Sequence, residues 1–365
     1  MRASVVATPP FLVDVAVNLT DCVFRGVGWN GKRLHEDDFD YILRRAAAKG
    51  VHQMIITGTS LPQCEKAIRL CRQYPGVLFC TVGVHPAHTA EFTRPLDLAA
   101  IGRLVDDEAA VILPGVNPNP ISETEEANAQ ARLRYLFDLV ERNRDVVVGV
   151  GEIGLDYAEL SCCPREIQER YFIEQLRHFA PLGLPFIFHS RECGMRLVEV
   201  LNAARDALSP FGPPLRGVVH SFNGSHEEQA AWLKMGFYLS LNGSAFREEK
   251  LARRLVSHLP RERLLLETDA PWCDLRRGDY GASFLSTTFD TTARRAPFEL
   301  GKCVERRNEP CHLVQILEAY LGARKDAIQK KEFSSQGESS LTCEEFTKEE
   351  LTRVLHENVK ALFGL

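Results

Sequence analysis

The sequence lacks the features of a membrane protein, of a secreted protein and of a protein that coats duplex DNA. No run of about 18 apolar residues is present to span a bilayer. The first ten residues hold one arginine and two prolines in place of the apolar core of a secretory signal. The formal net charge is −5, whereas proteins that coat duplex DNA are usually basic. We therefore expect no membrane contact, and only local contacts with any nucleic acid.

Regularly spaced cysteines are absent as well, although the chain contains 11 cysteines. Their number is odd and no Cys-x-x-Cys pair occurs, so a disulfide framework is not indicated. The simplest interpretation is a set of reduced thiols in a protein of the cytoplasm, the nucleus or both. A short organelle-targeting segment stays open as an alternative.

Internal repeats and a second hydrophobic core are also missing. With 365 residues, 45% of them hydrophobic, the chain is long enough for one large α/β barrel. We expect a single domain over residues 1–365, and a monomer rather than an oligomer. Loop insertions are expected near residues 109–126, 276–302 and 330–341.

Short β-branched apolar runs alternate with longer amphipathic segments along the chain. The runs predict strands over residues 11–19, 51–57, 77–84, 146–151, 185–188, 217–219, 237–241 and 263–267. The amphipathic segments predict helices over residues 38–49, 61–73, 129–143, 164–180, 193–207, 226–234 and 248–258. Ser60 and Ser225 suit N-caps, and Pro164 suits a first helical position. Eight such units, with no Gly-x-Gly-x-x-Gly after the first strand, favour a (β/α)₈ TIM barrel over an open α/β sheet.

Polar side chains follow five of the expected strands. They are His85, Glu152 with Asp156, His189 with Arg191, His220, and Glu267 with Asp269. The carboxyl ends of barrel strands converge at one mouth. Two imidazoles and two carboxylates suit a divalent cation such as Mg²⁺, Mn²⁺ or Zn²⁺, with Asp269 placed to take a proton from water. A single polar residue after a strand is more often structural, but this alternative weakens when several strand ends share the pattern.

Seven motifs in order resemble the TatD family of metal-dependent nucleases. They are VAVNLTD, TVGVHP, GEIGLDY, FHSRE, VVHSFNG, LLLETDAPWC and RRNEPCHL, which span nearly the whole chain, and the last two resemble the eukaryotic-type branch. The resemblance implies a barrel of the metal-dependent hydrolase type and a deoxyribonuclease, typically a 3′→5′ exonuclease on single-stranded ends. DNA repair and DNA fragmentation are both compatible with the family.

The resemblance also implies roles for individual residues. The metal-ligand positions fall on Glu152, His189, His220 and Asp269, with Mg²⁺ as the first expectation, and His85 matches a histidine that contacts phosphate or transfers a proton. Asp269, Glu152 and His85 are thus the expected catalytic residues.

The first strand departs from the family pattern. Many members carry His-x-His there, which completes a cage for two metal ions, whereas this chain has Ala16 and Asn18. We therefore expect one firmly held ion, with a second held weakly or delivered with the substrate.

Substrate contacts are expected from five side chains near the mouth. Arg191, Arg307 and Asn308 suit phosphate contacts, and Trp272 and Phe222 suit stacking on a terminal base. The alternative for each is a solvated loop arginine or a core aromatic residue.

Two other functions compete with a nuclease. One is an amidohydrolase or deacylase acting on a small amide, lactone or aminoacyl ester. Such enzymes commonly use a first-strand His-x-His and often a carboxylated lysine, and neither is apparent here. The other is a barrel that has lost catalysis and serves as a scaffold, against which the Glu152, His189, His220 and Asp269 set argues.

Overall fold

The computed structural model describes residues 11–112, 123–208, 214–293, 297–330 and 345–365. Most of the expected insertion at 109–126 and nearly all of that at 330–341 lie outside these ranges. Every helix in the described ranges is too short or too polar to cross a bilayer.

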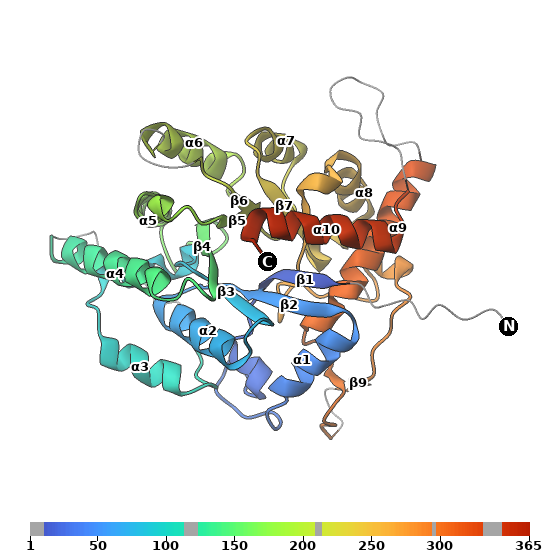
Figure 1. Ribbon diagram of the computed structural model, residues 1–365, viewed down its shortest axis with the longest axis horizontal. Coiled ribbons are helices and arrows are strands. Elements are labelled where there is room, and N and C mark those ends of the chain that lie inside the picture. The colour runs from blue at the N-terminus through green and yellow to red at the C-terminus, as the bar shows by residue number, and fades with distance from the viewer. Residues whose placement is uncertain (1–10, 113–122, 209–213, 294–296, 331–344) are drawn as a thin grey trace.

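Eight parallel strands form one sheet in the order of the sequence, and helices surround it (Figure 1). The strands are β1 (Leu12–Val17), β2 (Val51–Ile56), β3 (Leu78–Val82), β4 (Val147–Asp156), β5 (Phe186–Arg191), β6 (Gly217–Val219), β7 (Tyr238–Leu241) and β8 (Leu264–Leu266). All eight strands overlap the expected ranges, and the predicted TIM barrel is confirmed.

The barrel is closed where the segment after β8 meets β1. The backbone N–H of Asp269 donates to Ala16 O at 3.0 Å, and that of Asn18 donates to Ala270 O at 2.8 Å. The buried Asp14 carboxyl accepts from the backbone N–H of Thr268 at 2.9 Å and also contacts its hydroxyl. These bonds satisfy backbone groups that an open sheet edge would leave unpaired.

Seven helices match the expected ones. They are α1 (Phe39–Ala48), α2 (Leu61–Gln73), α4 (Glu123–Glu141), α5 (Arg165–Phe179), α6 (Arg196–Leu208), α7 (His226–Lys234) and α8 (Glu249–His258). The predicted cap at Ser225 is confirmed as a capping box with Glu228. Ser60 occupies an N-cap without a side-chain hydrogen bond. Pro164 is itself the N-cap, one residue before the position expected for it.

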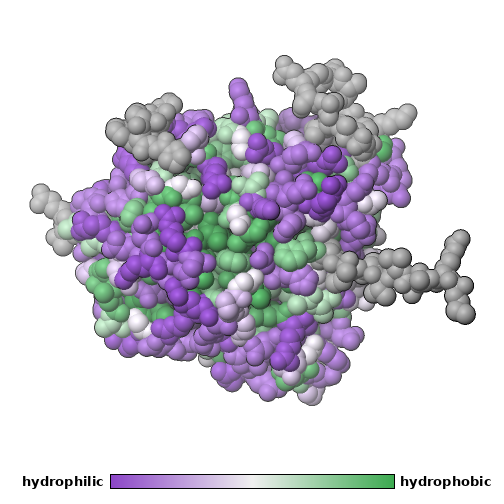
Figure 2. Space-filling model, in the orientation of Figure 1, coloured by the Kyte–Doolittle hydropathy of each residue, from purple (hydrophilic) through white to green (hydrophobic). Residues whose placement is uncertain are grey.

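Three further helices were not predicted: α3 (Leu98–Asp106), α9 (Leu313–Gln329) and α10 (Lys348–Phe363). In Figure 1, α10 crosses in front of the strands. Its apolar side chains Val359, Leu362 and Phe363 join one buried cluster with strand residues that include Ile187 and Val218. Hydrophobic residues also gather near the centre of this face, inside a hydrophilic rim (Figure 2). Helix α10 therefore covers the base of the barrel core.

The opposite end of the barrel carries the polar side chains. Ile187 and Val218 precede His189 and His220 by two positions, and side chains two apart on a strand share a face. The apolar layer that packs on α10 consequently lies directly beneath the two imidazoles.

We predict that replacing Asp14 with asparagine changes how stability depends on pH. Burial raises the pKa of Asp14 from 3.8 to about 8, so the folded chain keeps a proton that the unfolded chain releases. The stability of the wild type must then fall as pH rises between these values, by up to about 1.4 kcal/mol per pH unit. The Asp14→Asn variant lacks this loss. Urea unfolding between about pH 5 and pH 7.5 measures the difference, and parallel curves would contradict the prediction.

Candidate metal centre at the barrel mouth

Three donor atoms from three strands converge at the carboxyl ends of the barrel. Glu152 Oε1 lies 2.5 Å from His220 Nε2 and contacts His189 Nδ1, and the two nitrogens lie 3.1 Å apart. Glu152 and His220 are buried, whereas His189 is partly exposed. Among the described residues, this trio is one of the groups whose geometry suits a metal ion.

Glycine in β4 allows Glu152 to reach this position. Gly151 has φ of 144°, and a Cβ there would lie 2.6 Å from the carbonyl oxygen of Ile187 on β5. The strand also has an irregular register between Val150 and Ile153, where Glu152 lies. Only glycine fits this close approach of two backbones.

A second carboxylate orients His189. Asp156 Oδ2 lies 3.0 Å from His189 Nε2, which leaves Nδ1 directed at Glu152. A carboxylate on the far nitrogen of an imidazole fixes its tautomer and strengthens it as a ligand.

The loop after β3 adds His85 to the site. Its Nε2 lies 3.2 Å from His189 Nδ1 and 3.5 Å from Glu152 Oε1. Its Nδ1 accepts from the backbone N–H of Ala87 at 3.1 Å, so Nε2 carries the proton of the neutral ring. Burial and the neighbouring His189 lower the pKa of His85 to about 3. His85 consequently presents a neutral N–H to the mouth at ordinary pH.

The trio is strongly coupled electrostatically. Burial favours protonated Glu152, but the positive charges of His220 and His189 outweigh it and hold its pKa well below the usual range. Burial opposes the charge on His220, but Glu152 and Glu267 outweigh burial and raise its pKa. A cation at this position would compete with the imidazole protons for the same negative charge.

Glu267 supports His220 from the opposite side. Its Oε1 lies 3.4 Å from His220 Nδ1, and the same oxygen accepts from the backbone N–H and hydroxyl of Ser221 at 2.7 and 2.8 Å. Ser240 and Asn242 also donate to this carboxylate. Sequence analysis placed Glu267 at a strand end without a role. The alternating polar residues Ser240, on β7, and Asn242, directly after it, were the signal for inward-facing partners.

Asp269 is near the trio but separate from it. Its Oδ1 accepts from Asn18 Nδ2 at 2.9 Å, and its Oδ2 accepts from the Cys273 thiol at 3.3 Å. Among the described residues, it belongs to none of the groups whose donor atoms lie within 4.8 Å of one another. Burial raises the pKa of Asp269 to about 6, although the positive charge of His220 opposes this. The structure thus brings together three of the four predicted ligands.

Arg191 and Trp272 are exposed, as a substrate contact requires. The Arg191 side chain is 54% exposed and lies 3.6 Å from both Asp156 and Glu159. The Trp272 ring stacks on Trp29, with ring centroids 4.4 Å apart and planes 8° from parallel. Sequence analysis missed Trp29, because its partner lies far away in the chain.

Three other expected substrate contacts are buried. The Arg307 guanidinium, 6% exposed as a side chain, pairs with Asp38 and Glu309. Asn308 Nδ2 donates to the carbonyl oxygens of Thr268 and Trp272. Phe222 belongs to the hydrophobic core. The structure therefore gives Arg307 and Asn308 partners within the protein and leaves Phe222 no exposed face for a base.

A closed (β/α)₈ barrel with one carboxylate and two imidazoles meeting at its mouth defines the class of metal-dependent hydrolases. The chain belongs to the TatD related DNase family, whose model matches residues 13–364. The family predicted from the sequence motifs is therefore confirmed, and this membership implies a divalent metal.

Individual relatives resemble the chain over most of its length. The Deoxyribonuclease Tat-D of Schizosaccharomyces pombe is 35% identical over 325 residues, covering 88% of this chain and 92% of the relative. The 3′-5′ ssDNA/RNA exonuclease TatD of Cronobacter turicensis is 32% identical over 308 residues, covering 84% and 88%. A crystal structure of a TatD family hydrolase from Entamoeba histolytica superimposes with a TM-score of 0.75 at 26% identity, covering 98% of this chain and 99% of the other.

We predict that Arg307→Ala lowers the free energy of unfolding by about 3–5 kcal/mol, because it leaves the two buried carboxylates of Asp38 and Glu309 with one guanidinium, that of Arg45, in place of two. The matched control is Arg191→Ala, which removes an exposed arginine and should change stability by no more than about 0.5 kcal/mol. Urea denaturation of both variants provides the comparison. Equal stability losses would show that the buried pairs contribute nothing beyond an exposed arginine.

Proposed function

We propose that this chain hydrolyses phosphodiester bonds in DNA with a divalent cation, and that it shortens single strands from their 3′ ends. The observation that carries the proposal is the convergence of Glu152, His189 and His220 at the mouth of the barrel. The names of the relatives from Schizosaccharomyces pombe and Cronobacter turicensis support the substrate and the polarity. The nuclease names of these relatives favour this function over an amidohydrolase.

The chemistry of the donor set fits a divalent cation. Glu152, His189 and His220 would hold it, with Asp269 beside them. A carboxylate with imidazoles suits Mn²⁺ or Zn²⁺, and Mg²⁺ is our first choice because phosphate oxygens of the substrate would complete its coordination. Such an ion supplies polarisation of a phosphoryl oxygen and a lowered pKa for the attacking water.

Asp269 is our candidate for the general base. With a pKa of about 6, its carboxylate is mostly ionised at neutral pH yet able to take a proton. Asn18 Nδ2 and the Cys273 thiol each donate to one of its oxygens and so fix its orientation. Asn18 presents an N–H to Asp269 and therefore acts as a positioning residue.

His85 is our candidate for contact with the scissile phosphate. Its neutral ring carries a proton on Nε2, and this N–H faces the trio. An N–H donor at this place would stabilise charge that develops on a phosphoryl oxygen.

Arg191 and the tryptophan pair are our candidates for substrate binding. Arg191 is exposed beside Asp156, within reach of a phosphate. Trp272 and Trp29 form an exposed aromatic surface on which a terminal base could stack. Asn308 holds the backbone of Trp272, and buried Arg307 fixes the adjacent segment. The chain has a net charge of −5, which does not attract DNA to the protein as a whole. We therefore propose that a monomer in the cytoplasm or nucleus binds strand ends through these local contacts.

We expect purified protein with Mg²⁺ to shorten single strands stepwise from the 3′ end. Asp269→Asn should reduce the rate by about 10² to 10⁴-fold, the usual contribution of a general base. Strands labelled at the 3′ or the 5′ end, with and without a chelator, distinguish the polarity. The control is Asp138→Asn, at an exposed position of α4, which should retain full activity. Cleavage that survives both chelation and Asp269→Asn would eliminate the mechanism.

We expect one Mn²⁺ ion to bind tightly at the mouth. Glu152→Gln keeps the shape of the side chain but removes its charge, and it should weaken binding at least about tenfold. Calorimetric titration of both proteins gives affinity and stoichiometry. If the mouth of the wild type held two ions with equal affinity, the roles given to Ala16 and Asn18 would be wrong.

A further inference from the structure

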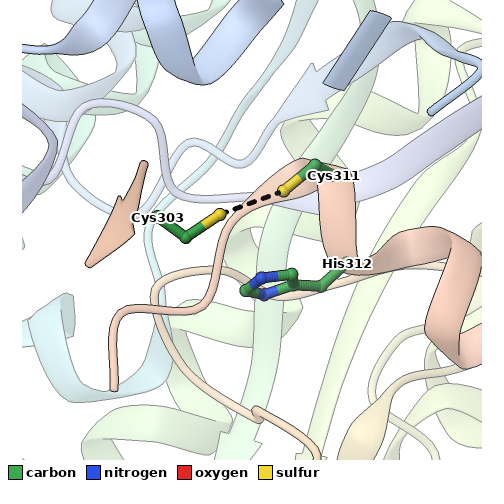
Figure 3. A group of neighbouring side chains, drawn as sticks. All are labelled: Cys303, Cys311 and His312. Atoms are coloured by element: carbon green, nitrogen blue, oxygen red, sulfur yellow. Dashed lines mark hydrogen bonds between the residues drawn. The ribbon is translucent and has the colours of Figure 1, made fainter. Parts of the chain in front are cut away.

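A second group of metal-ligating side chains lies outside the trio at the mouth. Cys303 lies on β10 (Cys303–Val304), and Cys311 and His312 lie on η7 (Pro310–His312) (Figure 3). One donor atom from each residue lies within 4.8 Å of the others, and the two sulfurs are 3.9 Å apart. Cys303 is 2% exposed and Cys311 is fully buried. This cluster has no part in the proposed hydrolysis.

Glu309 places a carboxylate oxygen beside the two sulfurs. Its Oε2 lies 3.8 Å from Cys303 Sγ and 3.9 Å from Cys311 Sγ, so the three atoms form a nearly equilateral triangle. Glu309 is fully buried.

The two sulfurs have the spacing of a pair of metal ligands, 3.9 Å. Ligand bonds of about 2.3 Å in a tetrahedral thiolate site place sulfurs about 3.8 Å apart. The observed distance between the sulfurs of Cys303 and Cys311 fits this geometry.

His312 is held in the way that a metal-bound histidine is held. Its Nδ1 lies 2.9 Å from Asn308 Oδ1. The amide cannot be reversed, because Asn308 Nδ2 donates to two backbone carbonyls. An amide oxygen can only accept a hydrogen bond, so His312 Nδ1 carries the proton. The Glu309 N–H also lies near Nδ1, but at 3.3 Å this contact is longer than the one to Asn308 and does not decide the tautomer. The lone pair is left on Nε2, and ligating histidines commonly donate their other N–H to such an oxygen.

The charges around the cluster leave room for a divalent cation. Arg45 and Arg307 both donate to Glu309, and both also donate to Asp38. Two guanidinium charges thus balance two carboxylates. A divalent cation with two thiolates would preserve this neutrality, which buried charges require.

We propose that Cys303, Cys311 and His312 hold a thiophilic divalent cation such as Zn²⁺, with the Glu309 carboxylate beside the two sulfurs. The site would fasten the end of the 276–302 segment to the start of α9. It is independent of the proposed nuclease function, because its test measures ligation and not cleavage.

Chelator-treated protein titrated with Co²⁺ under reducing conditions tests the proposal. We expect a thiolate-to-cobalt charge-transfer band in the near ultraviolet that Zn²⁺ abolishes and Mg²⁺ does not. Cys303→Ser should remove most of the band. Two controls should keep it: Cys273→Ser removes the thiol beside Asp269, and Glu152→Gln weakens the mouth, which offers no sulfur among its three donors.

A measurement on the wild type guards against a variant that fails to fold. X-ray absorption at the zinc edge should show sulfur neighbours at about 2.3 Å. A cobalt-loaded wild type without the band would overturn the proposal, as would a band that survives Cys303→Ser or is lost in Cys273→Ser. A disulfide between Cys303 and Cys311, detected as two missing thiols after denaturation without reductant, would overturn it as well.

Discussion

The attraction between the buried Glu152 carboxylate and the imidazoles around it is the interaction on which the site depends. An unpaired carboxylate in a barrel interior would cost several kcal/mol. His189 and His220 compensate its charge, and each is held from behind by another carboxylate, Asp156 or Glu267. Because these side chains come from different strands, the compensation exists only when the sheet is wrapped into a barrel. Folding and assembly of the site are therefore the same event.

The first strand serves the site through a backbone carbonyl and an amide side chain. Ala16 supplies only its backbone carbonyl, which fixes the backbone of Asp269, and Asn18 supplies an amide that fixes the carboxylate. A carboxylate held by two donors, with its pKa raised by burial, is better prepared to accept a proton than to bind a cation alone. Ala16 and Asn18 thus give Asp269 a defined position.

Much of the fold and three of the proposed ligands could be predicted, because both follow from local patterns. Apolar runs mark the strands, and the topology of a barrel brings their ends together whatever the loops do. The roles of loop side chains were harder to predict, because the burial of these side chains depends on residues far away in the sequence. Arg307, for example, pairs with Asp38, which lies 269 positions away. The Cys303 cluster follows no common spacing and was missed for the same reason. Helix α10 was missed although Thr347 and Glu350 form a capping box that announces it.

The position of α10 has a consequence for folding. This 16-residue helix finishes the floor of the barrel, and the apolar cluster that it joins includes Val13 on the first strand. The two segments are far apart in the sequence, and contacts between such distant segments form slowly. Until this contact forms, the apolar floor stays uncovered and prone to association with other chains.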